Sequence, residues 1–437
     1  MPEDVVAAEP PVPEAPPASA VAAGSLRTLV RSLRSAGYVD LFLAQVAPLA
    51  VSFVLTLVSA TLLGPERRGV LTFLMTGSRL CGALAYGSLH VPVVEGLRSG
   101  DRAGLRHGVR LVGAIWAVLT LVGAVQVARA WSGSGWVATD TGLQVGLALI
   151  GGAMVVLQFF GGRVLQGLGE NPRYVRVVVV QSVLYLVGSG GVLLTTRSPL
   201  LMFAAWYVSV VIGVALAVGS LRTVLRGRER GTAIGRSWRG FARSAMANNL
   251  GSIGQMVMLR ADVLVVGLVL GPAAAGVYGI ALSLTELSLI VPEVFALAVY
   301  GNRARMDAGS WGDHVRRTFR MNAGLAVVAA VGIALGAVVL KLGPLASYDG
   351  LVPLVLIILP GAFFAGYTRI ALSALQALDA TVPVGRFGAL ALVLSLGYFP
   401  AALGGLLGPA IVSSVAYALT AGYLHASLRA RMVRDGR

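Results

Sequence analysis

The chain has 437 residues, of which 56% are hydrophobic and 12% are charged, and its mean hydropathy is +0.80. So little polar surface excludes a water-soluble globule and predicts an integral membrane protein. The net charge of +16 does not indicate a nucleic-acid-binding protein, because long apolar runs separate the basic clusters. Strand-like alternation in segments of about ten residues is absent from the sequence, which favours helices over a β-barrel.

The first segment, residues 1–24, is rich in Pro and Ala and slightly acidic, with no basic region ahead of a short apolar core. This pattern predicts a disordered tail rather than a cleavable signal peptide. A basic stretch follows at Arg27, Arg31 and Arg34, so residues 1–37 are predicted to be a cytoplasmic tail and lead-in.

Apolar runs long enough to cross a bilayer come next, each bounded by Arg clusters, Gly-Pro pairs or polar turns. They predict an all-α integral membrane protein with about twelve transmembrane helices. The helices are expected at residues 40–62, 70–95, 108–130, 141–168, 174–195, 199–221, 244–269, 276–300, 318–341, 351–377, 382–402 and 406–428.

One octet occurs twice: Leu-Gly-Pro-x-x-x-Gly-Val stands at residues 63–70 and again at 270–277. On both occasions it joins two apolar runs. A Gly-Pro pair stops a helix and the following Gly relieves the turn, so each octet predicts a tight extramembrane hairpin. The offset of 207 residues is close to half the chain and indicates an internal duplication.

The duplication predicts two lobes of six helices. Six spans return the chain to its starting side, so the two halves are parallel repeats related by an axis along the membrane normal. The predicted parts are the tail and lead-in at 1–37, an N-terminal lobe at 38–221, a basic cytoplasmic linker at 222–243, a C-terminal lobe at 244–428 and a basic cytoplasmic tail at 429–437.

The basic residues concentrate in alternate connections between the predicted spans. Cytoplasmic loops carry the excess of Arg and Lys, so this bias predicts that both termini are cytoplasmic. The opposite connections hold only Arg67, Arg68, Arg129, Arg197 and Lys341.

Charged residues inside the predicted spans are the candidate functional residues. An Arg at the bilayer centre costs at least about 2.5 kcal/mol, so it needs a partner, a wet cavity or reach to the interface. Arg79 lies nine residues into the helix predicted at 70–95, and the repeat offset places Glu286 at the equivalent position. We interpret Arg79 as a substrate-binding residue and Glu286 as a residue for ion coupling or gating. The two could pair across the lobe interface during a transport cycle or as a static ion pair.

Arg260 and Asp262 also lie near the middle of a predicted span. Positions i and i+2 on a helix point in different directions, so the two are not expected to neutralise only each other. Asp262 could bind H⁺ or Na⁺ while Arg260 faces an anionic substrate, or both could belong to a buried polar network. Arg163 and Arg369 occupy comparable places nearer the cytoplasmic ends of their helices, where they could bind a phosphorylated headgroup or snorkel to the interface.

Several chemistries have no matching pattern in the sequence. There is no Walker A loop, no HExxH, no Gly-x-Ser-x-Gly, and the four His residues have no metal-ligand spacing. We therefore expect no cofactor, no resident metal and no enzymatic activity, and a transporter is the simplest interpretation.

The arrangement of two six-helix lobes, with Leu-Gly-Pro-x-x-x-Gly-Val-Tyr at 270–278 after Arg260-Ala-Asp262, resembles the polysaccharide (O-antigen-type) flippases of the multidrug/oligosaccharidyl-lipid/polysaccharide exporter superfamily. The resemblance covers about residues 38–430. It implies alternating access that moves an undecaprenyl-diphosphate-linked oligosaccharide across the bacterial cytoplasmic membrane, for cell-surface polysaccharide biosynthesis. Arg79 and Arg260 would then hold the diphosphate, because Arg binds phosphate oxygens in a bidentate way.

The resemblance leaves alternatives open. A cation-coupled multidrug exporter of the same superfamily also has twelve helices, although its cavity is expected to be dominated by acidic residues. A membrane scaffold that keeps the fold without transport is the second alternative. Peptidoglycan-precursor flippases commonly have fourteen helices and fit less well. Expected partners are the lipid-linked anionic glycan, membrane lipids, H⁺ or Na⁺, and a polysaccharide polymerase or glycosyltransferase; nucleic acid is not expected.

Overall fold

The computed structural model describes residues 38–87, 89–98, 102–132, 139–226, 238–303, 306–378 and 380–435. The predicted tail at 1–37 lies outside the described residues. All regular elements within these ranges are helical, which confirms the all-α prediction for this part of the chain. In chain order they are α2 (Tyr38–Tyr86), α3 (His90–Arg98), α4 (Ala103–Trp131), α5 (Thr139–Gly167), α6 (Asn171–Thr195), α7 (Pro199–Arg226), α8 (Trp238–Leu270), α9 (Pro272–Thr285), η2 (Glu286–Leu289), α10 (Ile290–Asn302), α11 (Ala308–Leu342), α12 (Leu351–Ala377), α13 (Thr381–Ser395), α14 (Tyr398–Leu403) and α15 (Leu407–Asp435).

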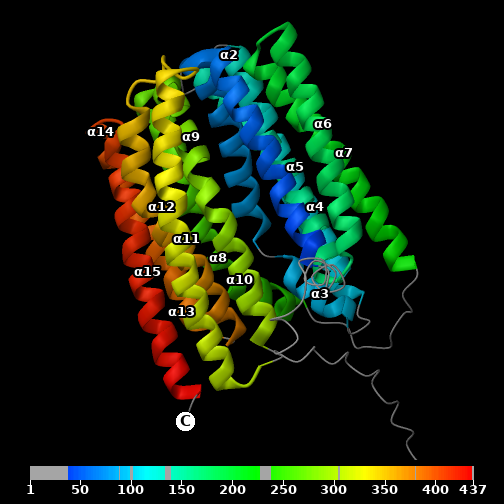
Figure 1. Cartoon of the computed structure of the whole chain (residues 1–437). Helices are drawn as coiled ribbons and strands as arrows, with labels where there is room; N and C mark the ends of the chain where they lie inside the picture. The colour runs from blue at the N-terminus through cyan, green and yellow to red at the C-terminus, as the bar shows by residue number, and fades with distance from the viewer. Residues whose placement is uncertain are drawn as a thin grey trace, which may run out of the picture.

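Eleven segments of the described chain are long and apolar enough to cross a membrane. The first of them covers Val46–Tyr86 and has 41 residues. At about 1.5 Å per residue it is roughly 60 Å long, twice the ~30 Å of a hydrocarbon core. Its backbone is non-helical at Gly64, where the chain reverses and α2 forms a hairpin (Figure 1). The eleven segments therefore supply twelve crossings, as the sequence predicts.

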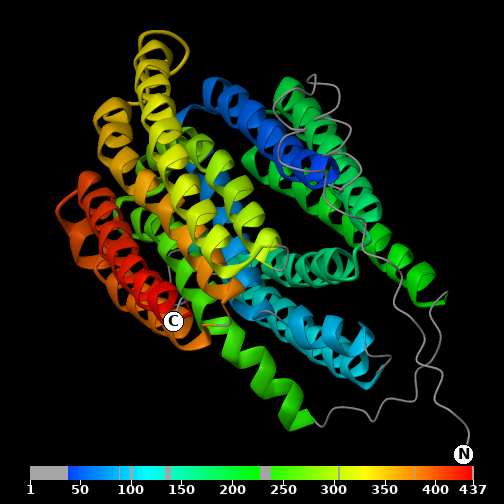
Figure 2. The same ribbon diagram turned by 60° about the horizontal axis from the view of Figure 1, so that its bottom comes forward.

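The helices form two lobes. Helices α2 to α7 lie together on one side and α8 to α15 on the other (Figures 1 and 2). Each lobe has buried apolar clusters, one built around Met202 and Trp206 in the first lobe and one around Phe387 and Tyr417 in the second. The connection between the lobes is shorter than the predicted linker at 222–243, because α7 continues to Arg226 and α8 begins at Trp238. Residues 227–237 lie outside the described residues.

The first glycine of each octet makes the turn. Gly64 has φ 73° and Gly271 has φ 90°, conformations that glycine adopts without the steric penalty of a Cβ. Proline follows directly and starts the next helix, where its missing N–H is harmless. The prediction that the later glycine of the octet relieves the turn is wrong.

The later glycine of each octet instead allows the two lobes to touch. A Cβ on Gly69 would lie 1.6 Å from the carbonyl oxygen of Pro272, and a Cβ on Gly276 would lie 2.0 Å from the carbonyl oxygen of Pro65. Each octet thus packs its glycine on the backbone of the other, at the end of the bundle that carries Gly64 and Gly271. We call this end the Gly-Pro end.

Several helices begin or break where hydropathy gives no signal. Helix α11 starts at Ala308 rather than near 318, because Asp307 caps it: its carboxylate accepts hydrogen bonds from the backbone N–H and the hydroxyl of Ser310, at 2.9 and 2.6 Å. These bonds hold the pKa of the Asp307 carboxyl below its usual value. The span predicted at 276–300 is interrupted by the 3₁₀ turn η2, and Gly87, with φ 52°, separates α2 from α3.

Substitution of Gly388 tests the packing of α8 on α13. A Cβ at Gly388 would lie 2.1 Å from the carbonyl oxygen of Leu250, so Gly388→Ala forces two helix backbones apart. Overpacking of this kind is expected to destabilise the protein by about 1 to 3 kcal/mol. Gly385→Ala, on the same helix with nothing within 4 Å of its Cβ position, is the matched control and should not destabilise. Thermal unfolding in detergent measures both; equal melting temperatures would contradict the packing.

Candidate functional site

Two adjacent cavities lie between the lobes. The first, which we call the deep cavity, has a volume of about 380 Å³. The second, which we call the vestibule, has a volume of about 490 Å³. They share the lining residues Phe159, Leu259, Glu293 and Arg369 and therefore lie directly next to each other. Both volumes fall within the range of ligand-binding pockets.

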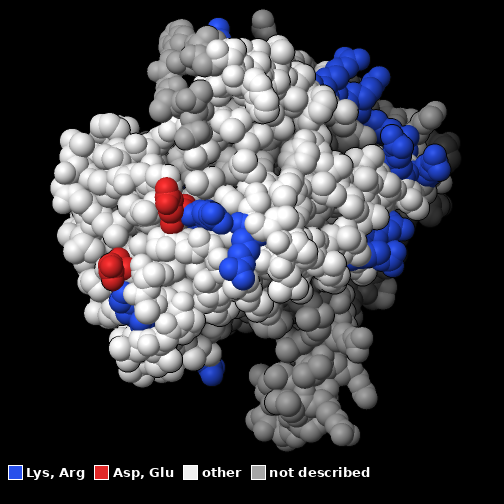
Figure 3. Space-filling view, turned by 90° about the horizontal axis from the view of Figure 1, so that it is seen from above, with Lys and Arg blue, Asp and Glu red and all other residues white. Residues whose placement is uncertain are grey.

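The vestibule lies toward the end of the bundle opposite the Gly-Pro end. Its lining includes Tyr86, the last residue of α2, and Gln376, near the end of α12. Gln376 is exposed, as is Arg163. At the Gly-Pro end the lobes are in contact: besides the glycine crossing, the buried Tyr348 hydroxyl donates to the carbonyl oxygen of Ala60, at 2.8 Å. Seen from this end, most of the visible surface is uncharged (Figure 3).

Of the six candidate residues, five line the two cavities. Arg79, Arg260, Glu286 and Arg369 line the deep cavity, and Arg163 and Arg369 line the vestibule. Because α2 turns at Gly64, the helix that carries Arg79 begins at Pro65, earlier than predicted. Arg79 therefore lies about 21 Å along this limb, at ~1.5 Å per residue.

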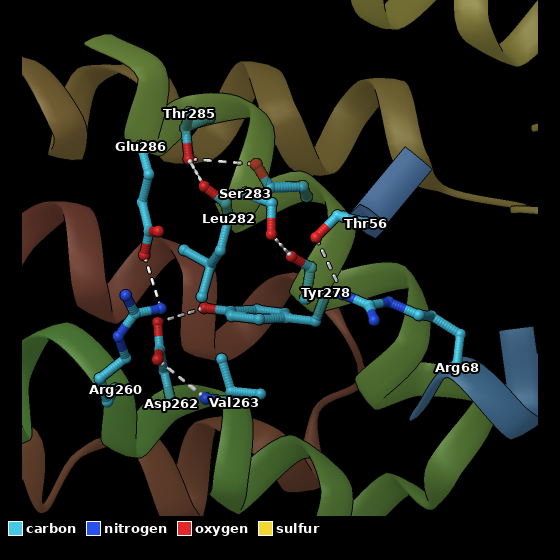
Figure 4. Close-up of polar contacts among 12 residues, drawn as sticks. Thr56, Arg68, Arg260, Asp262, Val263, Tyr278, Leu282, Ser283, Thr285 and Glu286 are labelled. Atoms are coloured by element: carbon cyan, nitrogen blue, oxygen red, sulfur yellow. Dashed lines mark hydrogen bonds and ion pairs between the residues drawn. The ribbon is translucent and has the colours of Figure 1, made fainter. Parts of the chain in front are cut away.

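The carboxylates of the cavity are paired within the C-terminal lobe. Arg260 Nη1 lies 2.6 Å from Glu286 Oε1, and both side chains are 20% exposed (Figure 4). Arg369 forms an ion pair with Glu293. The predicted pairing of Arg79 with Glu286 is not present in this conformation, because α8 packs beside α9 and η2 and brings Arg260 to Glu286 first.

Within the described part of the chain, two arginines of the N-terminal lobe have no such partner. No described carboxylate lies within ion-pair distance of the half-buried Arg79. Arg163 donates to the amide oxygen of Gln166, at 3.0 Å, which leaves its charge uncompensated. Four arginines and two glutamates line the two cavities, so the described lining carries excess positive charge on the N-terminal side.

Asp262 is the candidate that lies apart from the deep cavity. Its carboxylate is 1% exposed and accepts hydrogen bonds from the Tyr278 hydroxyl, at 2.9 Å, and the Val263 backbone N–H, at 2.8 Å (Figure 4). As predicted, Asp262 and Arg260 have different partners. A small cavity of about 20 Å³, room for roughly one water, is lined by Asp262 and Glu286 together. The buried carboxylate thus adjoins the deep cavity through Glu286.

Arg68 lies where the sequence did not predict it. The positive-charge bias assigned it to an extramembrane connection, but its side chain is 7% exposed and its Nη2 donates to Thr56 Oγ1, at 3.1 Å (Figure 4). The reason is the short turn: only Gly64 departs from helical geometry, so Arg68 is already on the first turn of a helix and faces inward.

Several polar residues of the cavity are not among the six candidates. Glu293 follows Pro292, where a kink near a cavity is expected from the sequence, and it partners Arg369. Gln158 and Gln181 line the deep cavity and are hydrogen-bonded to each other, at 2.8 Å. Neutral amides within long apolar helices give a weaker signal, because they also stabilise helix packing. In the described part of the chain no group of His, Cys, Asp and Glu side chains gathers that could hold a metal ion.

The two-lobed helical fold is similar to the fold of solved transporters of the MOP superfamily. An inward-facing multidrug resistance MATE family transporter of this superfamily is similar over 90% of this chain and 98% of its own, with a TM-score of 0.67 and 12% sequence identity. An outward-facing structure of such a transporter covers 92% of this chain and 96% of its own, with a TM-score of 0.63 and 14% identity.

A third similar structure has a pocket of a different character. It is a MOP superfamily transporter from Pyrococcus furiosus, described as having a binding pocket of reverse polarity that suggests a different function. It covers 90% of this chain and 96% of its own, with a TM-score of 0.58 and 12% identity. No family model and no curated protein matches the sequence. At these identities the likeness establishes the MATE fold and not the cargo.

Proposed function

We propose that the protein is a transporter that moves an undecaprenyl-diphosphate-linked oligosaccharide from the cytoplasmic to the outer leaflet by alternating access between its lobes. The observation that carries the proposal is the pair of arginines, Arg79 and Arg163, that line the two cavities without a carboxylate partner among the described residues. Arg79 is half-buried and Arg163 lies at the exposed mouth of the vestibule, and a diphosphate offers oxygens that a guanidinium can bind in pairs.

The two C-terminal ion pairs supply a second set of phosphate ligands. Arg260 and Arg369 form ion pairs with Glu286 and Glu293. A diphosphate entering the deep cavity competes with these carboxylates, and an exchange of partners would couple binding to movement of the lobes. Arg163 and Arg369, in the vestibule, guide the headgroup inward. Val46, Leu49 and other apolar residues also line the deep cavity. The polyprenyl tail would pack against these side chains and remain in the lipid while the headgroup enters.

The topology follows from the same proposal. Both termini and the vestibule face the cytoplasm of a bacterial cell, and the Gly-Pro end faces outward. The contact of the lobes at the Gly-Pro end corresponds to an inward-facing state. A polysaccharide polymerase or glycosyltransferase would supply or consume the cargo.

A cation-coupled multidrug exporter is the second candidate function. Glu286 and Glu293 both line the deep cavity and could bind an organic cation if their arginine partners moved away. The fold is equally consistent with this function, because the similar structures include multidrug resistance transporters.

Flipping in proteoliposomes separates the two functions. The purified protein is reconstituted, and transport of a fluorescent undecaprenyl-diphosphate-linked oligosaccharide or of a cationic dye is measured with and without an ion gradient. The proposal expects the glycolipid to flip and the dye not to move. Dye efflux without glycolipid flipping would establish the exporter instead, and movement of neither would favour a scaffold.

Asp262 is the residue proposed to bind the coupling ion, H⁺ or Na⁺. Its carboxylate is buried without a cationic partner within the described structure, beside a water-sized cavity that reaches Glu286. Asp262→Asn keeps the shape and removes the charge, so it is expected to abolish the dependence of transport on the ion gradient. The control is Asp349→Asn, because Asp349 is exposed near the Gly-Pro end. Unchanged gradient dependence in Asp262→Asn would contradict this role.

A further inference from the structure

Amide and ring side chains from both lobes line the vestibule. Tyr86 and His90 come from the N-terminal lobe, and their rings stack with centroids 5.6 Å apart and an interplanar angle of 14°. Asn249 and Gln255 come from α8 and Gln376 from α12. An amide side chain both donates and accepts hydrogen bonds, which is the capacity needed to bind hydroxyl groups. A phosphate-binding site alone would not use acceptor oxygens of this kind.

Three of these side chains have buried polar atoms without a hydrogen-bond partner in the described structure. They are the hydroxyl of Tyr86, Nδ1 of His90 and the amide oxygen of Asn249. A buried polar atom left unpaired is costly, so such groups are ordinarily satisfied by water or a ligand. All three residues line the same cavity, so the wall of the vestibule has hydrogen-bonding capacity that the described structure leaves unused.

The covalent order of the proposed cargo places its sugar in this space. The lipid tail, the diphosphate and the glycan follow one another along the molecule. When the diphosphate lies at Arg79 and Arg260 in the deep cavity, the tail leaves sideways into lipid. The glycan then extends toward the open side of the cavity, which is the vestibule. Arg163 and Arg369 at its lining would also tolerate an acidic sugar.

We infer that the vestibule is a glycan subsite in which Asn249, Gln255 and Gln376 bind sugar hydroxyls and the stacked Tyr86 and His90 rings pack against a sugar face. The inference rests on the proposed function and extends it: the diphosphate is held in the deep cavity, and the vestibule recognises the sugar. Selection among cargoes therefore depends on the vestibule amides and not on the arginines.

The test compares two cargoes in proteoliposomes: a fluorescent polyprenyl diphosphate that carries an oligosaccharide, and the same lipid without sugar. The variants are Asn249→Leu with Gln376→Leu, and separately Gln255→Leu, because leucine keeps the volume and removes the hydrogen bonds. Gln144→Leu on α5, outside the lining of both cavities, is the matched control. Monodisperse elution and an unchanged melting temperature establish that each variant folds. If the double variant does not fold, the flipping rates of Gln255→Leu test the subsite instead.

We expect the double variant to flip the glycan-bearing lipid about tenfold more slowly, as two neutral hydrogen bonds predict, with the sugar-free lipid unaffected within about twofold. Equal losses for both cargoes, or no loss for the glycan-bearing one, would overturn the subsite and leave the proposed function standing. A parent protein that flips only the sugar-free lipid would refute the oligosaccharide cargo of the proposed function together with the subsite. A parent protein that flips neither lipid would refute the proposed function and the subsite together.

Discussion

Replacing Arg79 by glutamine is expected to lower flipping of the lipid-linked glycan by about ten- to a hundredfold. Arg79 faces the deep cavity with no described carboxylate partner, so its charge is available to the cargo. A hydrogen bond to a charged group contributes about 1.5 to 3 kcal/mol, and 1.4 kcal/mol corresponds to a factor of ten. Glutamine keeps hydrogen-bonding capacity and removes the charge, which isolates the electrostatic contribution. Initial flipping rates in proteoliposomes measure the effect.

The control for this prediction is Arg110→Gln. Arg110 is exposed on α4 and lines neither cavity, so the same loss of charge should leave the rate within about twofold. If both variants lost activity equally, the effect would reflect net charge rather than the cavity. If Arg79→Gln flipped glycolipid normally while gaining transport of a cationic dye, the assignment of an anionic cargo would be wrong.

Replacing Gly276 by leucine is expected to abolish transport by preventing the lobes from meeting at the Gly-Pro end. A Cβ there would already lie 2.0 Å from the carbonyl oxygen of Pro65, so a leucine side chain can be accommodated only if the backbones separate. The variant should therefore populate a state open at this end. The control is Gly336→Leu on α11, where nothing lies within 4 Å of the Cβ position.

Spin-label distances report this opening. Thr195 and Ser347 are exposed near the Gly-Pro end, one in each lobe, and serve as labelling sites after Cys81 is replaced by serine. Gly276→Leu should shift the distance distribution to longer values, while Gly336→Leu should match the parent protein. An unchanged distribution together with normal flipping would show that the glycine crossing does not close the transporter.

Much of the fold could be predicted because it depends on patterns that are local in the sequence. Apolar runs give the spans, and the repeated octet at 63–70 and 270–277 gives the duplication. The roles of its two glycines could not be separated in this way. Gly64 takes a positive φ for local reasons, whereas Gly69 is required by a backbone from the other lobe, and no pattern within one octet indicates that contact.

The sequence predicts which charged residues line the cavity better than it predicts which of them form ion pairs with each other. The cost of burying charge pointed to Arg79, Arg260 and Glu286, and all three face the deep cavity. Which arginine pairs with Glu286 depends on how α8 packs beside η2, and hydropathy contains no information about that packing. For the same reason the sequence did not predict that Arg68 is buried.

The proposed function requires that the cavity between the lobes binds an anionic diphosphate. Equilibrium binding of a fluorescent short-chain polyprenyl diphosphate to the protein in nanodiscs, with a lipophilic cation of similar size as competitor, tests it most directly. We expect saturable binding of the diphosphate that Arg79→Gln weakens and that the cation does not displace. Saturable binding of the cation, with no binding of the diphosphate, would contradict it.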